Sequence, residues 1–175
     1  YGSAWRYRHR ARLSVREVAK KGTVLVGFHE KRSSFIADMK SCEILPKRVS
    51  DLLVPLRELI NSLSLRKKLP QIELAVTDEA LALVLRVLEK PTADDEAKLR
   101  QFQKNYGVDF WYQPKGPDSI YPMDPENAAR LKLHHRETGV EVVFRPTDFT
   151  QVNHRLNEVM VTRALRLLHL EPSSK

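Results

Sequence analysis

Residues 5 to 16 read Trp-Arg-Tyr-Arg-His-Arg-Ala-Arg-Leu-Ser-Val-Arg, and this alternation specifies the first element of the fold. Every even position except Ser14 is arginine, whereas the odd positions carry aromatic, histidine or aliphatic side chains. A period of two residues is that of a β-strand, in which successive side chains point to opposite faces. The sequence therefore predicts a strand over about 5–18, with one inward face and one face of guanidiniums. The guanidinium face comprises Arg6, Arg8, Arg10, Arg12 and Arg16.

These arginines need anions nearby, because like charges about 7 Å apart along a strand repel one another. Carboxylates on a neighbouring strand or phosphate groups of RNA would neutralise them. The expected neighbour, 23–31, follows a turn at Gly22 and contains one acidic residue, Glu30. More positive charge lies around that turn, at Lys20, Lys21, Lys31 and Arg32. Phosphate is therefore the favoured partner, since guanidinium forks match its oxygens and counterion release drives binding. Such contacts position RNA without reading its sequence.

Two segments in the middle of the chain carry the spacing of amphipathic helices. The first spans 49–63, where Pro55 must either kink the helix or restart it as a first-turn residue. The second begins at Thr92, which forms a capping-box pattern with Asp95 three residues later. Gly107 is expected to end this helix.

Short apolar runs separated by turn residues predict the remaining strands. These runs are 34–39, 71–76, 81–87, 108–113, 131–135 and 140–144. The second and third runs form one hairpin, and the last two form another. A final helix is expected over about 153–169. Strands joined by hairpins, with helices between them, indicate an α+β fold with antiparallel or mixed sheets.

The composition is that of one globular domain with a basic surface. The 175 residues are 42% hydrophobic and 30% charged, so we expect a single domain over 1–175. The formal net charge of +8 favours an anionic partner. No apolar run approaches the roughly 20 residues that cross a bilayer, so no membrane partner is expected. The start, 1–5, has no signal-like apolar core and is interpreted as an internal boundary.

Cys42 is the only cysteine, which excludes an internal disulfide and fits a reducing, cytoplasmic compartment. A lone cysteine is most often a small buried hydrophobe. No ligand-spaced histidine and no evident base accompanies it, so a metal role would need ligands from outside this chain. The six histidines show no zinc-like spacing, and each is expected on the surface or on a strand.

Residues 144–153 read Phe-Arg-Pro-Thr-Asp-Phe-Thr-Gln-Val-Asn and lead directly into the last predicted helix. On one interpretation, Asp148 and Thr150 cap that helix. On the other, the amide of Gln151 and the ring of Phe149 face a cleft at the helix N-terminus, where they would hold a flat polar ligand. No glycine-rich phosphate loop is present, so neither a Rossmann nor a P-loop site is indicated.

Three stretches together resemble one known family: 7–14 in the arginine-rich strand, 38–45 around Cys42, and Pro-Thr-Asp-Phe-Thr-Gln-Val-Asn at 146–153. They are similar to bacterial 23S ribosomal RNA uracil-5-methyltransferases of the RlmD type, in the same order and along essentially the whole chain. The chain matches the part between that family's cysteine-rich segment and its S-adenosylmethionine-binding domain. The resemblance implies a central domain whose residues 146–175 lead toward a Rossmann-like methyltransferase domain. That domain and an N-terminal RNA-binding domain are expected to lie outside this chain.

The resemblance also implies roles for individual residues. Cys42 matches the fourth ligand of a [4Fe–4S] cluster, whose other three cysteines lie upstream in the family. Gln151 matches a residue that contacts S-adenosylmethionine, and Phe149 in the same motif is carried over with it to the methyl-donor and uracil pocket. The arginines of the first strand would then contact the backbone of 23S ribosomal RNA.

The family's chemistry requires a nucleophilic cysteine thiolate, and this chain has no cysteine available for that role. Uracil C5 is a poor nucleophile, so in the family a cysteine thiolate adds to C6, C5 takes the sulfonium methyl group, and a base removes the C5 proton. The target base must also leave its stack. Because the one thiol, Cys42, is assigned to the cluster, we expect this chain alone to be inactive and to bind neither cofactor.

Two other hypotheses remain open from the residues alone. The chain could be a stand-alone basic RNA-binding module without catalysis, or an interaction domain whose basic face docks an acidic protein. The salt dependence of binding separates these two, because RNA contacts give a steep slope.

Overall fold

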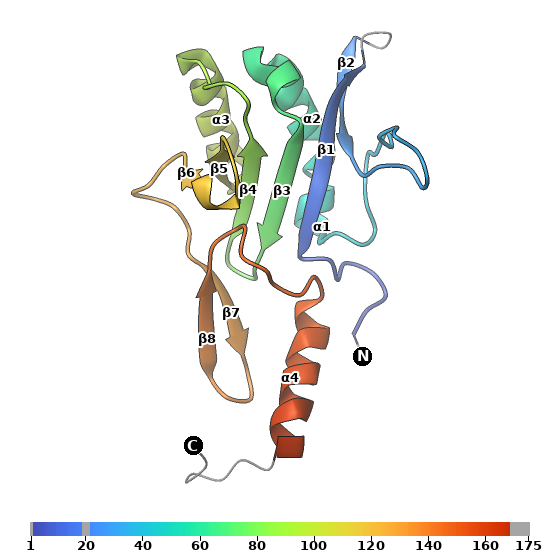
Figure 1. The fold of residues 1–175 in the computed structure, drawn as a ribbon, viewed down its shortest axis with the longest axis vertical. Helices are drawn as coiled ribbons and strands as arrows, with labels where there is room; N and C mark the ends of the chain where they lie inside the picture. Colours follow the sequence, from blue (N-terminus) through green and yellow to red (C-terminus); the bar gives the residue numbers. More distant parts are fainter. Residues whose placement is uncertain (1, 19–21, 169–175) are drawn as a thin grey trace.

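The computed structural model describes residues 2–18 and 22–168. It contains a six-stranded sheet with helices on one face and a separate two-stranded sheet (Figure 1). The predicted α+β class is therefore confirmed. Two residues of the predicted basic turn, Lys20 and Lys21, and the end of the chain at 169–175 lie outside the described residues.

The large sheet has the strand order β2-β1-β3-β4-β5-β6. Its strands are β1 (Arg10–Val18), β2 (Thr23–Gly27), β3 (Gln71–Val76), β4 (Leu81–Arg86), β5 (Asp109–Gln113) and β6 (Tyr121–Pro122). All neighbours pair antiparallel except β4 and β5, which are parallel. A helix joins β4 to β5, as a parallel pair requires a crossover connection. The first two predicted hairpins are confirmed, and the sheet is mixed.

Helices α1 (Lys47–Ser50), α2 (Leu53–Ser62) and α3 (Ala93–Tyr106) cover one face of this sheet (Figure 1). Short 3-10 turns, η2 (Ser64–Lys68) and η3 (Pro117–Ser119), lie in the connections. Alternate strand residues point toward the helices and form the main core, in which each fully buried aliphatic side chain stabilises the fold by roughly 1.5–3 kcal/mol. No helix in the described part of the chain is long and apolar enough to span a bilayer.

The helix boundaries follow the sequence signals. α2 begins at Leu53, so Pro55 lies in its first turn and the restart interpretation is correct. The capping box of α3 is present: Thr92 Oγ1 accepts a hydrogen bond from the N–H of Asp95 at 3.2 Å, and Asp95 Oδ2 accepts one from the N–H of Thr92 at 3.1 Å. Gly107 ends α3 in the left-handed conformation, with φ +60°.

Three strand predictions are wrong: β1 begins later than expected, β2 ends at Gly27 and not at about 31, and 34–39 is not a strand. β1 begins at Arg10, because the preceding residues leave the sheet and bond to a loop. The backbone N–H groups of Arg6 and Arg8 donate to the carbonyls at 43–44, both at 2.8 Å. The predicted strand at 34–39 forms only an isolated bridge. In both places loop contacts take the hydrogen bonds that a strand ladder would have used.

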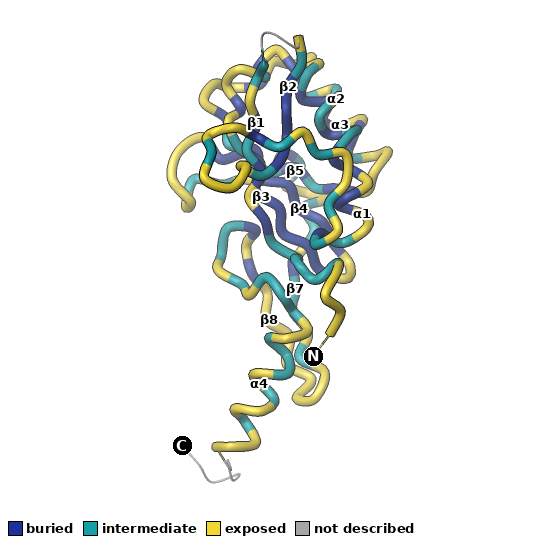
Figure 2. Tube along the Cα trace, turned by 90° about the vertical axis from the view of Figure 1, so that its right-hand side faces the viewer, coloured by how far each residue is buried: buried dark blue, intermediate teal, exposed yellow. Residues whose placement is uncertain are grey.

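The other end of the molecule comprises β7 (Leu131–His135), β8 (Val140–Phe144) and α4 (His154–Leu168). β7 and β8 form the third predicted hairpin. Leu131 and Phe144 pack with Ala75 and Ala82 in a second, smaller cluster, on the face of the sheet opposite the main core. α4 extends away from the sheet beside this hairpin, and none of its residues, all of them described, is buried (Figures 1 and 2).

Candidate functional site

A tight turn at Asp148 shapes the connection from β8 to α4. The Asp148 carboxylate accepts hydrogen bonds from the Arg145 backbone N–H at 2.7 Å and from Arg145 Nε at 3.1 Å. The N–H of Asp148 donates to the Arg145 carbonyl at 2.9 Å. The backbone N–H of Arg145, followed by its side chain, holds the pKa of Asp148 below its usual range. Asp148 is therefore a turn residue.

Asn153 is the residue that caps α4. Its Oδ1 accepts a hydrogen bond from the N–H of Leu156 at 3.0 Å, which is the side-chain geometry of an N-cap. The interpretation in which Asp148 and Thr150 cap this helix is therefore wrong. First-turn N–H groups carry the positive end of the helix dipole, so Gln151 lies just before a weakly positive helix end.

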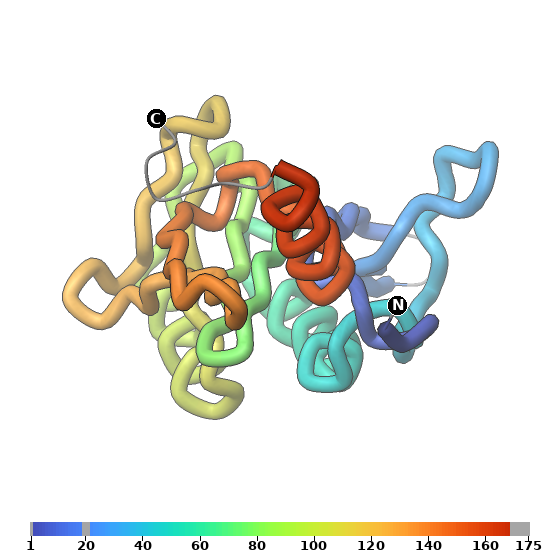
Figure 3. The backbone as a smooth tube through the Cα atoms, turned by 90° about the horizontal axis from the view of Figure 1, so that it is seen from below, coloured from blue at the N-terminus to red at the C-terminus, as the bar shows by residue number. Residues whose placement is uncertain are grey.

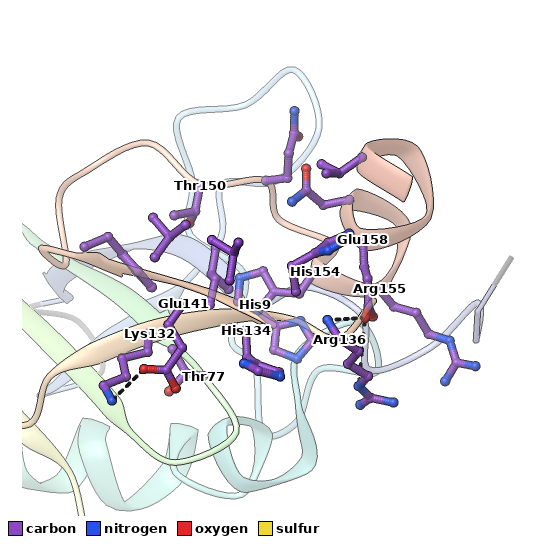
Figure 4. A pocket seen from close by; sticks show the side chains of 18 of the residues that line it. His9, Thr77, Lys132, His134, Arg136, Glu141, Thr150, His154, Arg155 and Glu158 are labelled. Carbon is purple, nitrogen blue, oxygen red and sulfur yellow. Dashed lines mark hydrogen bonds and ion pairs between the residues drawn. The ribbon is translucent and has the colours of Figure 1, made fainter. Parts of the chain in front are cut away.

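A stacked histidine pair joins this connection to the start of β1. The ring centroids of His9 and His154 lie 4.4 Å apart, with 17° between the ring planes (Figure 4). The N–H of His9 also donates to the Val152 carbonyl at 2.8 Å. Burial, followed by the neighbouring His9 ring, lowers the pKa of His154 to about 4. His154 is therefore neutral at pH 7.

A groove of about 1430 Å³ lies between α4 and the β7–β8 hairpin (Figure 4). Gln151 and Phe149 are among the residues that line it. Both side chains are exposed, and Phe149 is 84% exposed. The hairpin contributes apolar groups to the groove. Val140, Val142 and Val143 of β8 are 53%, 54% and 60% exposed. The groove therefore combines an aromatic ring, an amide and an apolar wall.

Polar contacts hold the hairpin tip beside α4. They are Arg136 N–H to Glu158 Oε1 at 3.1 Å, Thr162 Oγ1 with His135 Nε2 at 3.2 Å, and Arg166 Nη2 to Glu137 Oε2 at 3.2 Å. Because no residue of α4 is buried, these contacts rather than a packed core set the width of the groove along the described residues.

The chemistry available in the groove is that of binding. Its lining residues supply imidazole, carboxylate, amide and hydroxyl groups and the cationic side chains of Lys132, Arg136 and Arg155, and the thiol of Cys42 is not among them. The side-chain amide of Gln151 offers two donors and one acceptor. The ring of Phe149 offers a flat apolar face. A ligand with a planar ring and a polar end fits this set of groups.

The five arginines do not form one common face. Arg10, 13% exposed, pairs with Glu73 of β3 at 2.8 Å, and the same carboxylate contacts Arg12 at 3.5 Å. A carboxylate on a neighbouring strand thus neutralises part of the positive charge of the β1 arginines. The neighbour expected from the sequence was 23–31 alone, whereas β1 lies between β2 and β3.

The remaining arginines have distinct surroundings. The side chain of Arg12 is 66% exposed despite its contact with Glu73. Arg16 is exposed and donates to the Ser34 carbonyl at 3.0 Å. Arg8 is half-buried. Arg12 and Arg16 are therefore the β1 arginines that are most accessible to a partner.

Arg6 and Ser50 hold the loop that carries Cys42. Arg6 Nη1 donates to the Cys42 carbonyl at 3.2 Å, and the N–H of Cys42 donates to Ser50 Oγ at 2.9 Å. The half-buried side chain of Cys42 packs against the main core. Among the described residues, no group of three or more His, Cys, Asp or Glu is arranged to hold a metal ion. A [4Fe–4S] cluster takes four cysteine thiolates, so the single cysteine of this chain cannot hold one by itself.

The histidine pair and the apolar wall of the groove were not predicted from the sequence. His9 and His154 are 145 positions apart and show no ligand spacing, so only the fold could bring them together. The available signal was that His9 lies within the stretch 7–14 and His154 directly follows the stretch 146–153. For the wall, the signal was the run of adjacent apolar residues at 142–144, which breaks the alternation of a half-buried strand.

No protein-family model matches the chain. Curated relatives match it along nearly its full length. The 23S rRNA (uracil(1939)-C(5))-methyltransferase RlmD of Burkholderia lata is 60% identical over 168 residues, which are 96% of this chain and 36% of the relative. The proteins of the same name from Cupriavidus necator and Ralstonia pickettii are 57% and 56% identical over 174 residues. Both alignments cover 99% of this chain, and they cover 39% and 38% of the two relatives.

A solved structure shares the fold. The crystal structure of Pyrococcus abyssi tRNA (uracil-54, C5)-methyltransferase in complex with S-adenosyl-L-homocysteine superposes with a TM-score of 0.67 and 17% sequence identity, over 97% of this chain and 43% of that one. The chain thus spans less than two fifths of the length of its curated relatives. The resemblance inferred from the three motifs is confirmed: over almost its whole length, this chain matches a segment of the RlmD-type 23S rRNA uracil-5-methyltransferases.

Proposed function

We propose that this chain is the central part of an S-adenosylmethionine-dependent enzyme that methylates C5 of a uridine in 23S ribosomal RNA. The observation that carries the proposal is the groove beside α4, which Gln151 and Phe149 of the most specific motif both line. Identities of 56–60% to proteins named as such methyltransferases support the reaction. The Pyrococcus abyssi neighbour, solved with S-adenosyl-L-homocysteine, supports the methyl donor.

The groove residues have complementary roles in this proposal. The amide of Gln151 and the first turn of α4 bind the polar end of the donor, and S-adenosylmethionine supplies the methyl group when bound. Phe149, 84% exposed, offers its face to a planar ring. His154 is neutral at pH 7, so it adds no charge to those of Lys132, Arg136 and Arg155, which also line the groove.

In the proposal this chain binds and positions, and the bond-making groups come from sequence outside it. Cys42 is its only thiol and does not line the groove. The thiolate that adds to uracil C6 is therefore supplied elsewhere, and residues 146–175 lead toward the domain that carries it. Cys42 serves as one of the four thiolates of a [4Fe–4S] cluster.

A segment exchange tests the methyltransferase proposal. In the full-length Burkholderia lata relative, this chain replaces the segment that it matches, and the transfer of radiolabelled methyl groups from S-adenosylmethionine to a 23S rRNA transcript is measured. We expect the chimera to be active and Gln151→Ala to lower its activity about tenfold or more, as for loss of a hydrogen bond to a charged ligand. The matched control is Gln101→Ala, which removes an exposed glutamine of α3 that bonds only to Asn105 within the described residues. A folded chimera without activity would contradict the proposal.

The cluster assignment needs a separate test in the same chimera. Cys42→Ser is expected to abolish the broad visible absorption of an iron–sulfur cluster, because one of four ligands is lost. Ser41→Ala, at the neighbouring exposed position, is the control and is expected to keep the absorption. An unchanged spectrum in Cys42→Ser would remove Cys42 from the ligand set. The alternative function, a stand-alone RNA-binding module, predicts an inactive chimera together with tight RNA binding by the isolated chain.

A further inference from the structure

A second pocket lies on the face of the sheet opposite the main core, formed by β1, β2 and the loop 28–38. It encloses about 310 Å³, and its lining includes Arg16, Leu25, Glu30, Phe35 and Ile36. Leu25 and Ile36, 7% and 6% exposed, give it an apolar floor. Phe35 is 70% exposed, so its ring is available to a partner. The loop projects from the body of the molecule, in light blue at the right of Figure 3.

Backbone contacts give the loop 28–38 a defined shape. The N–H of Ala37 donates to the Phe28 carbonyl at 2.9 Å, and the N–H of Glu30 donates to the Phe35 carbonyl at 3.0 Å. Both bonds join the two arms of the loop, which turns at its tip. The pocket wall that carries Phe35 is therefore an ordered hairpin-like loop.

Gly27 allows this loop to lie directly against β2. A Cβ atom at Gly27 would lie 2.7 Å from the carbonyl oxygen of Ala37, a separation that side chains do not tolerate. On the other side of the pocket, the guanidinium of Arg16 is held by its hydrogen bond to the Ser34 carbonyl at 3.0 Å. Loop, strand and cation thus have defined positions relative to one another.

Positive charge around the pocket exceeds the negative charge available to it. Of its two carboxylates, Asp38 pairs with Arg57 at 2.5 Å, and Glu30 forms no ion pair within residues 2–18 and 22–168. Among the described residues, the one ion pair of Arg12 is its 3.5 Å contact with Glu73. The exposed cations on this strand and loop are Arg12, Arg16, Lys31 and Arg32. An anionic chain is the complementary partner.

We propose that this pocket holds one unpaired nucleotide of a single-stranded RNA segment. Sites for single strands combine a basic track for phosphates with aromatic rings on which bases stack, and Phe35 beside Arg16 reproduces that combination. The volume of about 310 Å³ is at the lower limit of ligand pockets, which suits a single base. The Glu30 carboxylate accepts hydrogen bonds and donates none, so it favours a base whose exocyclic amino group offers two N–H donors over uracil, which offers the single N3–H.

This inference deepens the proposed function, because it rests on RNA being the partner and adds a contact on a surface separate from the α4 groove. It requires no methyl transfer by this chain. Its test is therefore a binding measurement on the 175-residue chain, which can fail or succeed independently of the methylation assay.

The experiment measures fluorescence anisotropy of labelled adenosine and uridine hexanucleotides with the chain at several salt concentrations. Phe35→Leu removes the ring but keeps an apolar side chain, and we expect it to weaken binding about tenfold. Phe35→Tyr keeps the ring and is expected to stay within about twofold of wild type. Glu30→Gln is expected to reduce the preference for the adenosine oligomer.

Arginine variants test the phosphate contact in the same assay. Arg16→Gln is expected to weaken binding of both oligomers and to lower the salt slope by about one. The matched control is Arg100→Gln on α3, an exposed arginine paired with Glu96, which is expected to change neither quantity. Circular dichroism of each variant checks that the fold is retained.

Three results would overturn the inference. If Phe35→Leu binds RNA with wild-type affinity and Arg12→Gln binds it more weakly, RNA is the partner but the pocket does not hold a base. Absence of RNA binding by the wild-type chain at low salt would remove this contact, and methylation by the chimera would still decide the proposed function. Displacement of RNA by polyglutamate as effectively as by unlabelled RNA would assign the surface to an acidic protein.

Discussion

α3 and α4 are helices of 14 and 15 residues, and they differ in what their apolar sides meet. α3 places Leu99 and Phe102 in the main core, at 0% and 6% exposed. α4 has the more pronounced amphipathic pattern, yet Leu156 and Met160 are 38% and 48% exposed. Figure 2 shows the contrast as dark blue segments in the body and none along α4. An amphipathic pattern therefore predicts a helix, whereas burial depends on a partner that the pattern does not identify.

The proposed function offers a partner for the exposed side of α4. Val161 of α4 and Val142 of β8 both line the groove that contains Gln151. In the proposal, the methyltransferase domain packs on this surface and the methyl donor binds where the two meet. The stability of this chain should then depend on α3 and hardly on α4.

The largest expected difference comes from truncating one leucine in each helix. Leu99→Ala should lower the free energy of unfolding by about 3 kcal/mol, because it leaves a cavity at a position that is 0% exposed. Leu156→Ala should change it by less than about 0.5 kcal/mol, because that side chain is 38% exposed. Urea denaturation of the two variants measures both values. Equal losses would show that α4 is packed as firmly as α3.

The next difference concerns the polar ends of the two helices. The buried Asp95 carboxylate accepts hydrogen bonds from the Ser64 N–H at 2.7 Å and the Ser64 hydroxyl at 2.6 Å, besides the capping-box bonds. Asp95→Asn should therefore cost about 2 kcal/mol. Asn153→Ala at the cap of α4 should cost about 1 kcal/mol and appear mainly as lost helix content by circular dichroism. Exposed Asp94→Asn is the control for charge in the first turn of α3.

The pKa of Asp95 gives this second comparison a pH dependence. Burial alone would raise its pKa, but the hydrogen bonds from Ser64 and Thr92 outweigh burial and lower it. A lowered folded-state pKa means that the stabilisation is present at neutral pH and is lost as the pH falls through the folded pKa. The difference between wild type and Asp95→Asn should therefore shrink in acid. A constant difference would show that the carboxylate charge does not matter.

A smaller pH effect is expected at the base of α4. The pKa of His154 is lowered from 6.5 to about 4 by burial and by His9, so stability is present above pH 6.5 and is lost as the pH falls toward 4. The negative charge of Asp78 opposes this shift. Because the ring is partly exposed, the loss should be on the order of 1 kcal/mol. His154→Gln should remove this pH dependence in urea denaturation, and the exposed His134→Gln should retain it.

The smallest effect on stability is expected at the candidate site itself. Phe149 is 84% exposed, so Phe149→Ala should leave the free energy of unfolding within about 0.5 kcal/mol of wild type. A buried aromatic such as Phe102 should cost several-fold more when it is truncated. Thermal unfolding of the two variants compares them. A large loss in Phe149→Ala would mean that the ring serves the fold rather than a ligand.

Much of the candidate site could be predicted because its residues are adjacent in the chain. Gln151 and Phe149 are exposed beside a helix end, as the motif at 144–153 indicated. The capping residue was misassigned, since Asp148, Thr150 and Asn153 are all good caps and the choice depends on where the turn places the helix start. The groove and the stacked histidines could not be predicted, because they arise from the packing of α4 beside a hairpin and β1.

Local signals predicted most elements of this chain, because strand period two, the helix restart at Pro55, the Thr92 capping box and the left-handed Gly107 all act within a few residues. They failed at 5–9 and 34–39, where loop contacts replace a strand ladder. Which arginine charges are neutralised depends on the tertiary structure. Glu73, which neutralises Arg10 and contacts Arg12, lies 61 residues from Arg12 in the chain. The pairing of β1 with β3 places Glu73 opposite Arg12. The sequence pattern of a strand does not indicate which distant strand it will pair with.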